Sequence, residues 1–291
     1  MNSSLHGRTA LVTGAGRGIG RGIALGLAQS GARVGLLART GHEIDDACAE
    51  IHDAGGTAVA LAADVSDPEQ TRIAVERLVD EFGHVELLVN NAAVVWPLGP
   101  TQDVDPAALA AAIAINVIGP MTLARRVLPG MLAAGWGRIV NVSAAIAARP
   151  GMLAGLNTYA ASKGALEAHT LNLAAELEGT GVTANVYRPG AVDTSMQAYI
   201  RDQPREQIGA PLHDRFTTML RSGALITPRA SADRMRSPRR AGFGRDLGRQ
   251  RRRSRAMTTD RPATNHRSPG PRRRLHARRG ALSVRVEATQ N

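Results

Sequence analysis

The stretch 9–20 reads TALVTGAGRGIG and passes from an apolar run into a glycine-rich segment. Ala10–Thr13 is typical of a buried strand, and Ile19, Ile23 and Leu27 then recur every four residues, as on one face of a helix. Glycines permit a tight turn and a close approach to the backbone. Because the helix that follows begins with free N–H groups and a positive dipole end, the turn can bind a pyrophosphate. A glycine-rich turn without a ligand is the alternative.

Apolar runs separated by amphipathic segments continue through the first 228 residues. Strands are predicted at Ala10–Thr13, Val34–Ala38, Ala58–Ala63, Val85–Val89, Ile139–Val142 and Val182–Tyr187. Runs that are apolar throughout are typical of parallel strands covered on both faces. The pattern therefore predicts an α/β fold, a doubly wound parallel sheet of the Rossmann-like type in a single domain.

Two helices carry explicit start signals. Asp67 and Asp105 stand at N-cap positions, and each precedes a proline that would occupy the first helical position. The second helix is expected to be long and to be interrupted at Pro120. Its inward-facing residues are expected to be Leu109, Ile113 and Val117.

Composition divides the chain near Pro228. Residues 229–291 hold 19 arginines, no lysine and four acidic residues, a net charge of +15, whereas residues 1–228 carry −4. The tail lacks a sustained apolar period, so we predict a domain at 1–228 followed by a disordered basic segment at 229–291. Clustered arginines bind phosphate backbones without sequence preference, and only Phe243 could stack on a base, so no specific nucleic-acid recognition is expected.

The remaining composition excludes several classes of protein. The single cysteine, Cys48, rules out an internal disulfide and fits a reducing compartment. The first residues lack the apolar stretch of a signal peptide, and no run reaches roughly 18 uninterrupted apolar residues. We therefore expect a cytoplasmic protein without a membrane segment. The eight histidines show no ligand spacing, so no metal site is expected.

The end of the second predicted strand indicates the cofactor. NAD binders carry an acidic residue at this place, but here the sequence reads Leu37-Ala38-Arg39-Thr40. Arg39, together with Arg17 from the glycine loop, could pair with a 2′-phosphate. The pattern therefore favours NADP (NADPH) over NAD, with two solvated surface arginines as the alternative.

Tyr159 and Lys163 stand four residues apart at the start of a predicted helix, so they share a face. Lys163 is the only lysine of the chain. A neighbouring ammonium is expected to lower the pKa of the phenol from its ordinary value of about 10 by roughly 1–3 units, which suits a proton donor and acceptor. Ser143, at the end of the fifth strand, could bond a substrate oxygen or simply cap a turn.

Residues 191–225 depart from the strand–helix alternation. Ile208, Leu212 and Phe216 lie at helical spacing, so this segment could cover a site, or its apolar side chains could pack on the core. Its moderately apolar character favours an apolar substrate.

Together these motifs resemble the short-chain dehydrogenase/reductase family over roughly residues 5–225. The residues that match its cofactor motifs are Thr13, Gly14, Arg17, Gly18, Ile19 and Gly20 of the glycine loop, Asp64 and Val65, Asn91 and Ala92 of an Asn-Asn-Ala-Ala segment, and Pro189, Gly190, Val192 and Thr194. Asn116, Ser143, Tyr159 and Lys163 fall where its catalytic tetrad would lie. Ala93 stands where the family has glycine.

The resemblance implies an NADP-dependent oxidoreductase that moves a hydride between its cofactor and a carbonyl compound or secondary alcohol. Tyr159 would be the acid and base, Ser143 would polarise the oxygen, Lys163 would lower the tyrosine pKa and bond the nicotinamide ribose, and Asn116 would hold a relay water. A reductase of 3-oxoacyl thioesters is one specific expectation. The family also implies a homodimer or homotetramer, often packed through helices at 106–134 and 158–178.

One departure from the family is large. Its members end with a seventh strand, which is not recognisable in this sequence. The resemblance to the family stops near Pro228. Our hypothesis is that the arginine-rich tail is an out-of-frame reading of the original C-terminus. The alternative function is then a cofactor-binding protein with impaired or no catalysis because the last strand is missing.

Overall fold

The computed structural model describes residues 5–236 of the 291-residue chain. The chain divides into two compact units, residues 1–245 and residues 246–291, and the second lies wholly outside the described part. The predicted disorder of the tail beyond residue 236 therefore stays a prediction.

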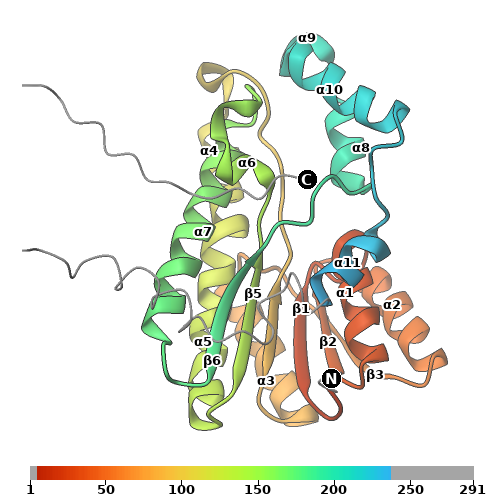
Figure 1. Ribbon diagram of the computed structural model, residues 1–291, viewed down its shortest axis with the longest axis vertical. Helices are drawn as coiled ribbons and strands as arrows, with labels where there is room; N and C mark the ends of the chain where they lie inside the picture. The colour runs from red at the N-terminus through yellow and green to blue at the C-terminus, as the bar shows by residue number, and fades with distance from the viewer. Residues whose placement is uncertain (1–4, 237–291) are drawn as a thin grey trace, which may run out of the picture. The chain divides into compact units, whose positions relative to one another are not determined.

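The described residues form one six-stranded parallel sheet in the order β3-β2-β1-β4-β5-β6 (Figure 1). Its strands are β1 (Thr9–Thr13), β2 (Arg33–Ala38), β3 (Thr57–Ala62), β4 (Leu87–Asn90), β5 (Gly137–Val142) and β6 (Val182–Tyr187). After β3 the chain crosses back over β1 to add β4, and this reversal opens a crevice at the carboxyl ends of β1 and β4. The predicted doubly wound sheet is confirmed.

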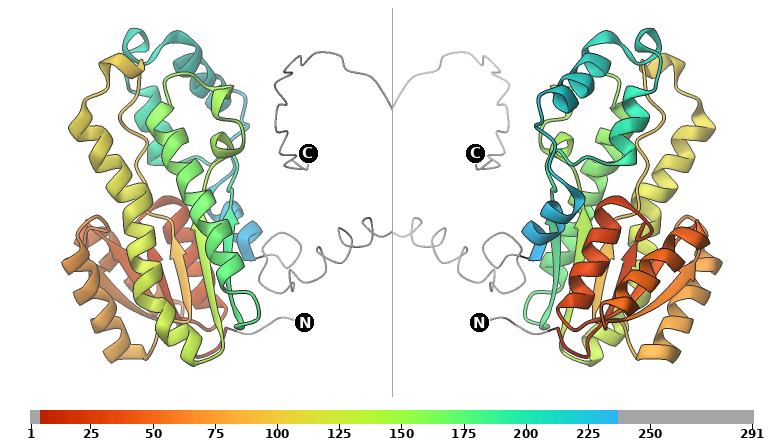
Figure 2. Two further views of the ribbon diagram at one scale, coloured as in Figure 1. Left: turned by 90° about the vertical axis from the view of Figure 1, so that its left-hand side faces the viewer. Right: turned by 90° about the vertical axis from the view of Figure 1, so that its right-hand side faces the viewer.

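Helices cover both faces of the sheet (Figures 1 and 2). On one face α1 (Gly18–Gln29) and α2 (Gly41–Asp53) bury Ile23, Leu27, Ile44 and Ile51. On the other face lie α3 (Pro68–Phe82), α5 (Gly119–Ala133) and α7 (Asn157–Glu176). The short helices are η1 (Thr101–Asp103), α4 (Pro106–Ile113), α6 (Ala145–Ala148) and η3 (Pro150–Met152).

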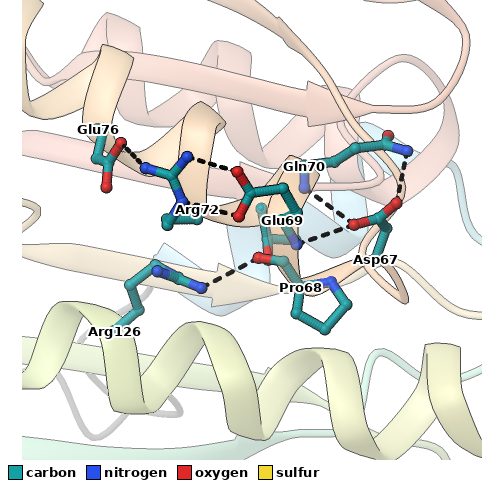
Figure 3. Close-up of polar contacts among 8 residues, drawn as sticks. Asp67, Pro68, Glu69, Gln70, Arg72, Glu76 and Arg126 are labelled. Carbon is teal, nitrogen blue, oxygen red and sulfur yellow. Dashed lines mark hydrogen bonds and ion pairs between the residues drawn. The ribbon is translucent and has the colours of Figure 1, made fainter.

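Helix α3 shows how the chain encodes a helix start. The Asp67 carboxylate accepts from the N–H groups of Glu69 at 2.9 Å and Gln70 at 3.0 Å, and Pro68 takes the first helical position (Figure 3). These bonds to the backbone lower the pKa of Asp67. Arg126 of α5 donates to the Pro68 carbonyl at 3.1 Å, so the cap also joins α3 to α5. The predicted N-cap is confirmed.

The long helix predicted from Asp105 is interrupted as expected. Between α4 and α5 the residues Ala114–Ile118 (η2) form a π-helical turn, which ends two residues before Pro120. Proline cannot donate the backbone bond that a continuous α-helix needs, and a π turn accommodates the missing bond. The prediction of the inward-facing residues was partly wrong. Val117 is buried and Ile113 is half-buried, but Leu109 is exposed.

Pro106–Ala133 is, among the described residues, one helical stretch long and apolar enough to cross a membrane, with a mean hydropathy of 1.9. Counting uninterrupted apolar residues did not reveal it, because Asn116, Gly119 and Pro120 break the run. Its best window is 44% buried inside the protein, against the sheet. Core helices of globular proteins share these properties, so the stretch is weak evidence for a membrane span.

The segment after β6 folds into α8 (Ser195–Arg201), α9 (Arg205–Ile208) and α10 (Ala210–Arg221) above the carboxyl ends of the strands (Figure 1). Ile208, Leu212 and Phe216 are buried in a cluster that also contains Val95, Ile146 and Leu156, with Tyr159 and Met196 packed against it. Both interpretations of this segment therefore hold, because its apolar residues pack on the fold and do so beside Tyr159.

The domain boundary expected at residue 228 falls inside a helix, α11 (Pro228–Arg236). Ser231, Ala232 and Met235 are fully buried, and α11 packs on α1. The Tyr187 hydroxyl donates to the Ser231 carbonyl at 2.6 Å. Two small residues and one methionine suffice for this contact, which the arginine-rich composition of the tail concealed.

Candidate active site

A cavity opens where the sheet reverses direction, between the glycine loop, the carboxyl ends of the strands and the start of α7. Most residues predicted from the sequence line it: Gly14, Arg17, Gly18, Ile19, Arg39, Asp64, Val65, Asn91, Ala92, Ser143, Tyr159, Lys163, Pro189 and Thr194. Thr13, Gly20, Asn116, Gly190 and Val192 do not line it. The structure therefore brings most of the predicted residues together around one cavity.

The glycine loop is packed too closely for side chains. A β-carbon at Gly20 would lie 2.1 Å from the Gly14 carbonyl oxygen, and one at Gly14 would lie 2.9 Å from the Ala92 Cα. Arg17, the N-cap of α1, makes no side-chain cap, so the first N–H groups of the helix face the loop without that partner. The turn is built mainly of glycines and lies at the positive end of the α1 dipole, so it fits the pyrophosphate of a dinucleotide.

Asn91 and Thr13 hold the loop in place. The Asn91 amide donates to the carbonyl oxygens of Thr13 at 3.0 Å and Gly14 at 3.2 Å. In return, the Thr13 hydroxyl accepts from the N–H groups of Asn91 and Ala92, both at 3.0 Å. These residues act on the cavity through the backbone of the loop.

The glycine loop and the end of β2 form one end of the cavity, which we call the nucleotide end. The two arginines there, Arg17 and Arg39, both have acidic neighbours. Arg17 bonds Glu43 at 3.3 Å, and Arg39 lies 3.7 Å from Asp64. The other carboxylate oxygen of Asp64 accepts from the N–H and the hydroxyl of Ser66. Two guanidinium groups close to the end of β2 are suited to a phosphate.

At the opposite end Lys163 lies buried on α7. It is 2% exposed, and its ammonium donates to the Val142 carbonyl at the end of β5 over 2.7 Å. The ammonium is 5.8 Å from the centre of the Tyr159 ring. Helical spacing thus brings the pair to one wall of the cavity, as the sequence predicts.

The pKa values of the pair differ from the prediction for Tyr159. Burial raises the pKa of the phenol to about 12, and the expected lowering by Lys163 is wrong for this structure. The physical reason is that Tyr159 packs in the apolar cluster of the α8–α10 segment, where the phenolate is poorly solvated. Burial also lowers the pKa of Lys163 to about 8, and the negative charge of Glu167 opposes that shift.

Ser143 is bonded away from Tyr159. Its hydroxyl donates to Glu167 of α7 at 2.6 Å, and the Ser143 N–H pairs with the Tyr187 carbonyl of β6. Arg188 holds Glu167 through two hydrogen bonds, one of 2.7 Å from its Nε. Within residues 5–236, the serine is therefore part of a Ser143–Glu167–Arg188 chain, and Ala144 packs in the cluster beside Tyr159.

Asn116 lies in the π-helical turn and is 1% exposed. Its amide accepts from the Val94 N–H and donates to the Val94 carbonyl, both at 2.8 Å, and also bonds Ser162 of α7 at 3.0 Å. The π turn directs this side chain inward, which joins the loop after β4 to α7. Val94 lines the cavity, so Asn116 shapes the site from behind.

The segment after β6 contributes the last wall. Pro189 and Thr194 line the cavity, and Gly190 has a φ of 82° that favours glycine. Val192 is buried and pairs with Ile226 in an isolated parallel bridge. Within residues 5–236, no group of three or more His, Cys, Asp or Glu residues could hold a metal ion.

Two acidic residues at or beside the site escaped the sequence analysis. Glu167 follows Lys163 by four residues, so helical spacing could have revealed it. Glu43 lies in the first turn of α2, where an acidic residue is common for helix stability alone. Its pairing with Arg17, 26 residues away, has no local signal.

The chain is similar to known proteins of one family. The family model of the short chain dehydrogenases matches residues 8–205. A short chain dehydrogenase from Pseudocercospora fijiensis is 35% identical over 75% of this chain and 70% of its own. A cis-4-hydroxycyclohexanecarboxylate dehydrogenase from Sinomonas cyclohexanicum is 33% identical over 72% of this chain and 83% of its own. Among solved structures, an actinorhodin polyketide ketoreductase variant with NADPH superposes with a TM-score of 0.70, at 32% identity over 80% of this chain and 89% of that one.

Proposed function

Because the chain belongs to the short-chain dehydrogenase family, we propose that this oxidoreductase uses NADP(H) and interconverts a secondary alcohol and its carbonyl compound. The observation that carries the proposal is the buried Lys163 beside Tyr159 on one wall of the cavity. Burying a lysine ammonium costs free energy of folding, so a lysine kept in a buried position indicates a function. This one is also the only lysine of the chain.

The cofactor would lie along the cavity with its pyrophosphate at the glycine loop and the start of α1. Asp64 and Val65 would border the adenine, while Pro189, Gly190, Val192 and Thr194 would form or support the wall at the nicotinamide. When bound, the nicotinamide supplies or accepts the hydride. The close packing at Gly14 and Gly20 supports this arrangement, since a β-carbon at either position would collide with the Gly14 carbonyl or with Ala92 and distort the turn.

The chain's own residues would handle the proton. Tyr159 would donate it to the substrate oxygen in reduction and accept it in oxidation. When Tyr159 gives up its proton a phenolate forms, and the nearby ammonium of Lys163 would stabilise it against the effect of burial, so Lys163 would ease the first of these steps. Asn116 would keep the floor of the site fixed through Val94. Ser143 would reach a substrate oxygen only after its hydroxyl turns away from Glu167. We therefore propose that Ser143 contributes less to catalysis than Asn116, Tyr159 and Lys163.

NADP is the proposed cofactor because Arg17 and Arg39 both line the nucleotide end. The end of β2 carries no carboxylate that would accept from a ribose hydroxyl. The polyketide ketoreductase relative was solved with NADPH, which supports the same choice.

The proposed substrate is a small carbonyl compound or alcohol with an apolar body. Side chains of the α8–α10 segment and Ile146 form an apolar wall beside Tyr159. Two relatives act, by their names, on a ring-bearing hydroxy acid and on a polyketide ketone. The 3-oxoacyl thioester remains the specific proposal, with cyclic ketones as the second class.

We propose a homodimer or homotetramer packed through α4, α5 and α7. Their outer faces expose Leu109, Met121, Leu132 and Leu171, the last to 67%. A cytoplasmic location and the absence of specific nucleic-acid partners stay predictions. A cofactor-binding protein without catalysis is not favoured, because the chain's relatives are dehydrogenases and reductases.

The test begins with binding. Purified full-length protein is titrated with NADPH and, in parallel, NADH, and nicotinamide fluorescence is followed. We expect NADPH to bind more tightly, and a screen of 3-oxoacyl thioesters and cyclic ketones then to give turnover that Tyr159→Phe abolishes. Binding without turnover on any ketone would favour the non-catalytic alternative, and binding of neither nucleotide would contradict the proposed function.

A further inference from the structure

Two acid–base pairs join α2 to the region of α1. Arg17 meets Glu43 at 3.3 Å, and Arg21 meets Glu50 at 2.8 Å. The two glutamates lie on the same helix, seven residues apart, but only Glu43 lines the cofactor cavity. The first pair is therefore placed to act on a bound nucleotide, and the second is a natural reference for it.

Backbone packing keeps Glu43 at the glycine loop. A β-carbon at Gly16 would lie 2.7 Å from the Glu43 Cβ, so the first turn of α2 rests directly on the loop. The carboxylate is anchored to this place even though the Arg17 side chain is long and exposed. Arg17 is its sole hydrogen-bonding partner among residues 5–236.

The other carboxylate at this end is held differently. Asp64 accepts from the N–H and hydroxyl of Ser66 at 2.8 and 2.6 Å, and its distance of 3.7 Å to Arg39 exceeds a hydrogen bond. Its orientation is thus set by its own turn. Arg39 stays available to an anion, whereas Arg17 is engaged.

A 2′-phosphate that binds Arg17 must compete with Glu43 for its guanidinium. An unphosphorylated ribose escapes this competition, and carboxylates are known acceptors for ribose hydroxyls. We infer that Glu43 lowers the preference of this protein for NADPH over NADH by holding Arg17. The inference rests on the NADP-dependent function proposed above and names the residue that limits that preference.

The experiment measures dissociation constants of NADPH and NADH by fluorescence titration of the full-length protein at low ionic strength. Glu43→Gln removes the charge at nearly constant shape, and Glu50→Gln is the matched control on the same helix. For Glu43→Gln we expect the NADPH constant to fall about tenfold, as the loss of one nearby charge interaction allows, while the NADH constant stays equal or rises. Glu50→Gln should change both constants by less than about twofold.

A double-mutant cycle tests the route through Arg17. In an Arg17→Ala background, Glu43→Gln should no longer tighten NADPH binding, because no guanidinium is left to release. Equal selectivity in Glu43→Gln and Glu50→Gln would overturn the inference, and so would a gain that persists without Arg17. Preferential NADH binding by the unmodified chain, with the predicted response to Glu43→Gln, would contradict the NADP assignment alone. Binding of neither nucleotide would overturn both.

Discussion

At the nucleotide end of the cavity Arg17 and Arg39 are 68% and 63% exposed and face carboxylates across 3.3 and 3.7 Å. At the opposite end Lys163 and Asn116 are 2% and 1% exposed, and each is fixed by bonds of 2.7–2.8 Å to backbone groups. Exposed charges are screened by salt and cost little to change. Buried polar groups are part of the fold. Cofactor preference should therefore be adjustable in this protein, whereas its chemistry is tied to its stability.

The largest expected effect is at the buried end. Tyr159→Phe removes the only proposed proton donor, so turnover should fall by roughly 10²–10⁴-fold. The ring remains, and NADPH affinity should change by less than about twofold. Steady-state rates and fluorescence titration of the same preparation check both parts. An equal loss of affinity and turnover would show that the phenol serves binding rather than proton transfer.

Asn116→Ala should come next. It leaves the N–H and carbonyl of Val94 without their side-chain partner, so the free energy of unfolding should fall by about 2–4 kcal/mol. Denaturant unfolding followed by circular dichroism measures it. Asn185→Ala is the control and should cost clearly less, because within residues 5–236 it lies on the edge strand β6 and its amide bonds only the Thr183 hydroxyl. Similar losses would show that the burial of Asn116 adds nothing to the stability of the fold.

NADPH binding at the nucleotide end should depend on the salt concentration. Arg39→Gln is expected to weaken NADPH binding about tenfold near 10 mM salt, and the loss should shrink at 500 mM, because exposed charges are then screened. NADH binding should hardly change. Fluorescence titrations at the two ionic strengths measure the loss of NADPH affinity in each. A loss that is independent of salt would mean that Arg39 is held in a fixed, desolvated contact with the phosphate.

A smaller effect is expected in the pH profile. The pKa of Lys163 is lowered to about 8 by burial, and the charge of Glu167 counteracts this. Activity that needs the ammonium should therefore decline as the pH rises through about 8. Glu167→Gln removes the opposing charge, so the alkaline decline should move to lower pH.

Rates across pH 6–10 measure the profile, and Glu176→Gln, further along α7, is the control. An unmoved decline in the Glu167 variant would show that another group limits the rate at high pH. Loss of activity at every pH, without a shift, would point instead to the Ser143 orientation.

Local patterns in the sequence foretold the parts of the fold that depend on local causes. Asp67 caps α3 with the predicted backbone bonds, and Pro68 takes the first helical position. The six strands were found because each is buried by helices and reads as an apolar run. Such elements need no knowledge of distant residues.

The failures share a dependence on tertiary contacts. The pKa of Tyr159 is raised by burial, to which packing against a segment some 50 residues later contributes, and the spacing to Lys163 carries no information about that contact. Leu109 is exposed because apolarity alone does not choose between a core and another surface. Helix α11 was missed because its contact with α1 uses small residues among arginines.

Lys163 gives the protein an unusual spectroscopic property. Since the chain contains no other lysine, protein grown with isotope-labelled lysine should show one side-chain ammonium resonance in an NMR spectrum. That signal would come from the wall of the cavity, with no surface lysines to obscure it. One peak would then report nucleotide entry, the ionisation of the neighbouring phenol and the effect of each variant. Reagents that modify amines would likewise have a single side-chain target, and protection from them would measure how well the site is closed.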